Sequence, residues 1–100
     1  MTVRYTRRAL AELDEVLSFI ERQSPQGARS VKSRIEEVIA LLSQYPHAGP
    51  LTNKGRLRRI VAYPYPYLIY YQANETNVVI HGVRHAARRP LSQEDRRNPS

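Results

Sequence analysis

The chain has 100 residues, of which 41% are hydrophobic and 25% charged, and its formal net charge is +7. This length and composition are typical of one globular domain and exclude a largely disordered chain. The sequence contains no cysteine, which excludes disulfides and thiolate metal sites and is compatible with a reducing cytoplasm. Residues 1–10 lack the apolar core of a signal peptide, and no apolar run reaches the ~20 residues that span a bilayer. We therefore expect a soluble cytoplasmic protein with no membrane partner.

The excess positive charge is concentrated in the second half of the chain. Residues 6–44 contain six basic and six acidic side chains, whereas residues 54–90 contain seven basic side chains and one acidic side chain, Glu75. Such a cluster favours an anionic partner, either nucleic acid or an acidic protein segment. Positive charge also improves solubility, but solubility does not require that the charges be clustered.

The first elements expected along the chain are a short strand and an amphipathic helix. Val3 and Tyr5 alternate with polar neighbours, which predicts a strand, and Thr6 is a suitable N-cap for the helix that follows. Helical spacing places five apolar residues on the buried face of this helix: Ala9, Leu13, Val16, Leu17 and Ile20. The opposite face is expected to carry the charged residues Arg8, Glu12, Glu15 and Arg22.

A second helix is expected to follow almost directly. Ser24 and Pro25 form an N-cap followed by proline at the first helical position, which ends one helix and begins the next. The predicted buried face of the second helix contains six residues: Ala28, Val31, Ile35, Val38, Ile39 and Leu42. This helix should end before Tyr45-Pro46, because proline disfavours helical geometry in the residue before it. The two helices then form a helical hairpin.

Beyond a loop at residues 46–55, the apolar pattern changes to the period of two that is typical of strands. Strands are predicted at residues 57–63, 67–72 and 78–83, joined by a turn at residues 63–66 and a hairpin loop at residues 73–77. Short turns imply antiparallel neighbours, so the predicted fold class is α+β: an N-terminal strand, a helical hairpin and a three-stranded antiparallel β-meander. One face of the sheet should cover the hairpin and the other should stay open to solvent or a partner. We expect one domain at residues 1–89 and a polar, flexible tail at residues 90–100.

The first candidate site is the basic stretch that contains Lys54, Arg56, Arg58 and Arg59. In a strand, Arg58 points to the side opposite its neighbours Leu57 and Arg59, so at least one arginine should lie on the open face of the sheet. Lys54 and Arg56 are expected in the loop beside that face. Arginine binds phosphate and carboxylate through two parallel hydrogen bonds. Alternatively, the same charges protect a solvated strand edge against aggregation.

The second candidate site is the end of the last strand, where Arg84, His85 and Arg88 lie close together. Even spacing predicts that His81 and His85 share a strand face. Histidine can act as an acid or base near neutral pH, and arginines can hold a phosphate, so the cluster could cleave a phosphodiester. Alternatively, His81 is a buried, hydrogen-bonded residue among valines. The sequence shows no nucleophile motif, metal-ligand spacing or phosphate-binding glycine loop, so we expect no cofactor and no metal.

Five tyrosines form the third candidate set: Tyr63, Tyr65, Tyr67, Tyr70 and Tyr71. Tyrosines can stack on nucleic-acid bases, but in strands they more often pack on the core or on a protein partner. We therefore favour packing for this set.

Three stretches of the second half resemble the RelE/ParE superfamily of toxins from type II toxin–antitoxin, or plasmid-stabilisation, modules. They are RLRR at residues 56–59, YPYLIYY at residues 65–71 and VVIHGVRHAAR at residues 78–88. The opening Tyr5-Thr6-x-x-Ala9 with Leu13, and Tyr45-Pro46-x-x-Gly49 after the second helix, are also similar to the family. The resemblance covers residues 3–89 and implies a helical hairpin on an antiparallel sheet. It also implies a cognate antitoxin that wraps the toxin, with operator DNA bound through the antitoxin.

The resemblance implies two alternative activities. RelE-like members cleave messenger RNA on the ribosome, and the matching positions here are Lys54, Arg58, Arg84 and His85. This chain has no tyrosine after Tyr71 and no glutamate near the loop start, which departs from the nuclease pattern. ParE-like members bind and inhibit DNA gyrase without a comparable catalytic set.

The ending Val83-Arg84-His85 is closer to the ParE branch, so we favour a gyrase inhibitor. The expected partner-binding residues are Lys54, Arg56, Arg58, Arg59, Arg84 and Arg88. A non-toxic relative that keeps only antitoxin binding is a third possibility.

Overall fold

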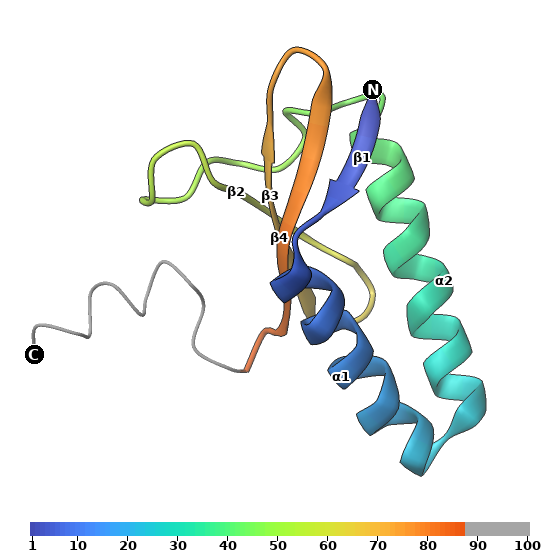
Figure 1. The fold of residues 1–100 in the computed structure, drawn as a ribbon. Helices are drawn as coiled ribbons and strands as arrows, with labels where there is room; N and C mark the ends of the chain where they lie inside the picture. The colour runs from blue at the N-terminus through green and yellow to red at the C-terminus, as the bar shows by residue number, and fades with distance from the viewer. Residues whose placement is uncertain (88–100) are drawn as a thin grey trace, which may run out of the picture.

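The structure is a computed structural model that describes residues 1–87. The predicted tail at residues 90–100 and the candidate residue Arg88 lie outside the described residues. Six elements follow one another along the chain: β1 (Thr2–Tyr5), α1 (Arg7–Gln23), α2 (Pro25–Leu42), β2 (Arg58–Val61), β3 (Tyr67–Ala73) and β4 (Asn77–His85). The helical hairpin lies against one face of the sheet, as Figure 1 shows, and the predicted α+β fold is confirmed.

Side-chain caps fix where the two helices begin. The Thr6 hydroxyl accepts a hydrogen bond from the N–H of Ala9 at 3.0 Å, and the Ser24 hydroxyl accepts one from the N–H of Gly27 at 2.9 Å. Pro25 occupies the first turn of α2, where its missing N–H costs nothing. The six residues predicted for the buried face of α2 are all buried, which confirms that prediction.

The sheet has the strand order β1-β4-β3-β2. The pairs β2–β3 and β3–β4 are antiparallel, as predicted, and β1 adds to β4 in parallel. Strand β2 is shorter than the predicted 57–63, because the chain already turns after Val61 and Tyr65 donates its N–H to the carbonyl of Ala62. Strand β4 is longer than predicted, because its pairing with β3 continues to Tyr67↔His85.

The two faces of the sheet bury different side chains. Tyr67, Ile69 and Tyr71 belong to the main core, which the helices cover. Leu68 and Tyr70 point the other way and pack with Leu57, so the far face is partly closed by the segment before β2 and is less open than predicted. Among the described residues, the buried Tyr70 hydroxyl has no hydrogen-bond partner. The three tyrosines of β3 are buried, as the packing interpretation predicts, whereas the side chain of Tyr63 is 74% exposed.

A β-bulge in β4 changes the direction of the side chains along that strand. Tyr70 pairs with Gly82, but the next residue, Tyr71, pairs with Ile80, so His81 is the extra residue. Because a bulge interrupts the alternation of side chains, Ile80 and His85 share the helix face whereas His81 lies on the far face. The prediction that His81 and His85 share a face is therefore wrong.

Candidate functional site

A hollow of about 340 Å³ lies on the sheet face that is opposite the helices. Six residues from the start of α1, the segment before β2, and strands β3 and β4 line it: Thr6, Arg8, Lys54, Leu57, Gln72 and His81. Because of the bulge, the side chain of His81 lies in this hollow. His81 is therefore half-buried at a surface site and is not part of the core. Burial lowers the pKa of His81 below its ordinary value of 6.5, which leaves the imidazole neutral at pH 7.

Arg58 is turned toward the protein's own backbone. Its guanidinium donates to the carbonyl oxygens of Gly49 at 2.8 Å and of His47 at 3.5 Å. The side chain therefore fastens the loop at residues 46–50 to the start of β2. Of the predicted partner-binding residues, Arg58 has the clearest structural role.

Tyr71 fastens the same loop from the centre of the sheet. Its hydroxyl accepts a hydrogen bond from the N–H of Gly49 and donates one to the carbonyl of Pro46, both at 2.9 Å. Burial raises the pKa of Tyr71, so the hydroxyl remains protonated and able to donate. A Cβ atom on Gly49 would lie 2.7 Å from the carbonyl oxygen of Arg59, so only glycine fits. These contacts explain the glycine of the Tyr45-Pro46-x-x-Gly49 pattern.

Arg84 lies against the carboxylate of Glu12. The side chain of Arg84 is 11% exposed, and its Nε lies 3.4 Å from Oε2 of Glu12. The same carboxylate oxygen pairs with Nε of Arg8 at 3.1 Å, and Oε1 accepts a hydrogen bond from the N–H of Val83 at 3.0 Å. Glu12 thus joins α1 to the edge of β4 beyond the last residue of β1.

The expectation that Glu12 lies on the solvent-facing side of its helix is wrong. Its side chain is 19% exposed, because β1 pairs with β4 only as far as Tyr5↔Ile80 and leaves the N–H of Val83 for another acceptor. The available signal was its spacing: Glu12 follows Ala9 by three residues and precedes Val16 by four, at the border of the apolar stripe.

His85 faces the helices, on the other side of the sheet from His81. Its Nδ1 accepts a hydrogen bond from the N–H of Ala87 at 2.9 Å, and its ring meets the ring of Tyr67 edge to face at 5.2 Å. A groove of about 420 Å³ opens here between the end of β4 and α1, where Phe19 is 54% exposed. His85 and Arg84 are adjacent in sequence, but His85 contacts Tyr67 on the helix side of the sheet, whereas Arg84 contacts Glu12.

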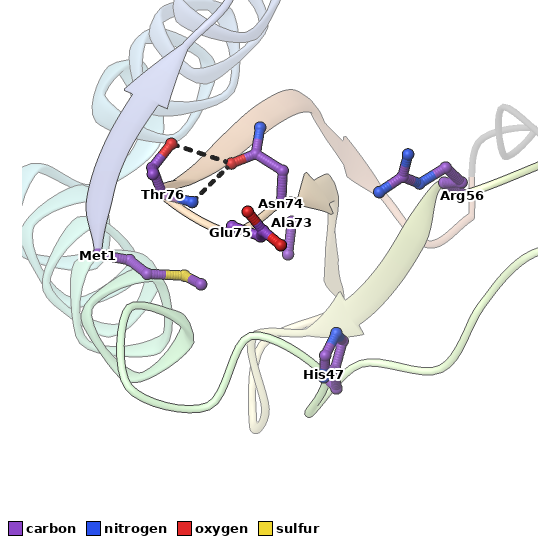
Figure 2. A pocket seen from close by; sticks show the side chains of 7 residues that line it. All are labelled: Met1, His47, Arg56, Ala73, Asn74, Glu75 and Thr76. Carbon is purple, nitrogen blue, oxygen red and sulfur yellow. Dashed lines mark hydrogen bonds between the residues drawn. The ribbon is translucent and has the colours of Figure 1, made fainter.

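A larger hollow of about 630 Å³ lies near the tip of the β3–β4 hairpin. Figure 2 shows Met1 and Arg56 at opposite sides of it, with Glu75, from the hairpin, between these two and with His47 at the bottom of the view. The hairpin tip is held by Asn74, whose side-chain oxygen accepts hydrogen bonds from the N–H groups of Thr76 and Asn77. Arg56 is exposed, and Arg59 is half-buried on β2.

The basic residues predicted as a site are therefore spread over several places. Lys54 lines the hollow beside His81, Arg56 lines the larger hollow, Arg58 holds a loop and Arg84 pairs with Glu12. Within residues 1–87, no group of three or more histidine and acidic side chains is arranged to hold a metal ion. No described helix is long and apolar enough to cross a membrane.

A helical hairpin packed on one face of a four-stranded sheet is the architecture that the resemblance to the RelE/ParE superfamily of toxins implies. Residues 3–90 match the family model described as the ParE toxin of the type II toxin–antitoxin system parDE. The chain belongs to this family.

Two relatives and one solved structure agree with this assignment. The Y4kP protein of Sinorhizobium fredii is 36% identical over 84 residues, which cover 84% of this chain and 86% of the relative. Toxin RelE2 of Caulobacter vibrioides is 37% identical over 84 residues, covering 84% and 93%. A structure of the chromosomal ParDE system from P. aeruginosa has the same fold, with a TM-score of 0.74, 20% identity, and coverage of 85% of this chain and 95% of that one.

Proposed function

We propose that this protein is a toxin that inhibits DNA gyrase by binding it, without catalysing a reaction, and that a cognate antitoxin neutralises it. The observation that carries the non-catalytic part is that the histidine and the arginines expected for RNA cleavage do not converge. His85 lies on the helix side of the sheet, Arg84 pairs with Glu12, and Arg58 bonds to loop carbonyls. Cleavage of a phosphodiester needs an acid or base and a cation on the same phosphate.

The charge distribution supports an acidic protein as the neutralising partner. The basic residues of the second half, with Glu75 as the one acidic residue at residues 54–90, suit a disordered acidic segment that folds on binding. The relative in the ParDE system is named for a toxin–antitoxin pair, which supports the same kind of partner here. Operator DNA would then be bound through the antitoxin.

A ribosome-dependent endoribonuclease is the second candidate, and the hollow beside His81 favours it. A neutral imidazole there has Lys54 and Arg8 as neighbours around one space. In that case His81, not His85, would act as the base. Mapped cleavage within translated codons that persists in His85→Ala and is lost in His81→Ala would support this candidate.

The first experiment is induced expression of the full chain with and without the adjacent antitoxin gene. We expect growth arrest that is reversed by co-expression. Growth arrest by a variant that carries both His81→Ala and His85→Ala, as strong as that of the unmodified chain, would support the non-catalytic account. Harmless expression of a folded protein that still binds the antitoxin would instead indicate a non-toxic relative.

A further inference from the structure

The carboxylate of Glu12 lies against the end of β4 that carries Arg84. This carboxylate pairs with Arg8 at 3.1 Å and Arg84 at 3.4 Å, and accepts the N–H of Val83 at 3.0 Å. We propose that Glu12 is a specificity-determining residue: it keeps Arg8 and Arg84 from binding nucleic-acid phosphates and so reserves the basic surface for a protein partner. This inference rests on the proposed function only in treating that surface as a protein-binding one.

The geometry makes replacement of Glu12 by a phosphate unfavourable. A phosphate that bound both guanidiniums would have to displace the carboxylate, and Glu12, whose side chain is 19% exposed, would lose both cations and the N–H of Val83 while lying beside a second anion. That N–H lies at the part of β4 that β1 does not cover, since β1 ends at Tyr5↔Ile80. Val83 is buried, and a buried backbone donor without an acceptor is unfavourable, so the carboxylate is held by the backbone as well as by two charges.

The charge balance leads to the same conclusion. Arg8, Glu12 and Arg84 together carry a net charge of one instead of two. Affinity for nucleic acid, and its dependence on salt, grows with the number of cations that contact phosphates. The trio therefore contributes less to phosphate binding than its two arginines would alone.

The test replaces Glu12 by glutamine in the full-length protein. Glu12→Gln keeps an oxygen for the N–H of Val83 but removes the negative charge. The measurement is binding to a labelled single-stranded RNA oligonucleotide between about 50 and 200 mM salt. We expect binding on the order of tenfold tighter at low salt. The slope of log affinity against log salt should steepen by about 0.7 to 1.4, which corresponds to one or two additional phosphate contacts.

The matched control is Glu37→Gln. Glu37 pairs with Arg34 on the exposed side of α2 at 3.2 Å, so this variant makes the same charge change away from the sheet. We expect its affinity and slope to stay close to those of the unmodified protein. If Glu12→Gln and Glu37→Gln behave alike, or if Glu12→Gln shows no detectable gain in RNA binding, the inference is wrong.

A second pair of variants decides the question if Glu12→Gln does not fold. Arg8 is 56% exposed at its side chain and Arg56 is exposed, so both can be changed with little risk to the fold. Arg8→Gln should lower RNA affinity less than Arg56→Gln does, because Glu12 already offsets part of the charge of Arg8. An equal loss in both would overturn the inference. None of these measurements uses gyrase or the antitoxin, so failure here is distinguishable from failure of the proposed function.

Discussion

The hydroxyl of Tyr71 lies 2.9 Å from the backbone nitrogen of Gly49, a residue 22 positions earlier in the chain. This buried contact joins the centre of the sheet to the loop that follows α2. Arg58 reaches the carbonyl of the same glycine at 2.8 Å, so both polar groups of Gly49 are bonded to sheet residues. The loop at residues 46–50 is consequently positioned by the sheet, and with it His47 at the border of the larger hollow.

Tyr71→Phe should destabilise the protein by about 1–3 kcal/mol, because the buried N–H of Gly49 and the carbonyl of Pro46 would both lose a partner. Urea denaturation followed by circular dichroism measures the free energy of unfolding. Tyr63→Phe is the control: Tyr63 is 74% exposed, so its change should stay within about 0.5 kcal/mol. Equal stabilities for the two variants would contradict the role of Tyr71.

Gly49→Ala should destabilise by about 1–3 kcal/mol through overpacking, because the new Cβ would lie 2.7 Å from the Arg59 carbonyl oxygen and 3.0 Å from the Tyr71 ring. The same denaturation experiment measures this loss. Gly55→Asn is the control, since Gly55 has a φ of 63°, which asparagine tolerates, and no atom lies within 4 Å of its Cβ position. A fully stable Gly49→Ala protein would show that the loop is looser than the contacts imply.

Arg58→Gln should be less stable than Arg56→Gln by about 1–3 kcal/mol, because Arg58 donates charged hydrogen bonds to loop carbonyls whereas Arg56 is exposed. Loss of toxicity in an Arg58 variant would then reflect a loosened loop and not a lost partner contact. Growth arrest and thermal unfolding should be measured on both variants. If Arg58→Gln were as stable as Arg56→Gln but non-toxic, direct partner binding by Arg58 would be favoured.

Much of the fold could be predicted from the sequence, because the deciding interactions are local. Thr6 and Ser24-Pro25 fix the helix starts through caps within three residues, and helical spacing identifies the buried face of α2. The parallel pairing of β1 with β4 joins residues over 70 positions apart, and no local pattern encodes it. Strand β2 ends at Val61, two residues before the end that the sequence predicts, because the turn already begins at Ala62, ahead of Pro64.

The candidate site could be predicted less well, because its geometry depends on pairings between distant elements. The bulge that separates His81 from His85 arises from the β3–β4 register, while spacing along one strand indicates a shared face. Glu12 follows the charge pattern of a solvent-facing helix residue, yet it bonds to β4 across 71 positions. Composition places most of the excess basic residues in the second half of the chain, but it does not indicate which of them the protein uses internally.

Stability should depend on pH through His81. Burial holds the pKa of His81 below 6.5, so the unfolded chain takes up a proton more readily than the folded protein as pH falls. The stability that His81 contributes is thus present above about pH 6.5 and is lost as pH falls through the folded pKa. His81→Gln should unfold with a weaker pH dependence across this range, as urea denaturation at a series of pH values would show. An unchanged pH dependence in His81→Gln would contradict the burial of His81.

The most direct test of the central claim is plasmid supercoiling by purified DNA gyrase in the presence of the purified full-length protein. The account predicts that supercoiling is inhibited, that His85→Ala inhibits as well as the unmodified protein, and that an equimolar amount of the antitoxin restores activity. Unchanged supercoiling at protein concentrations that arrest growth would contradict it.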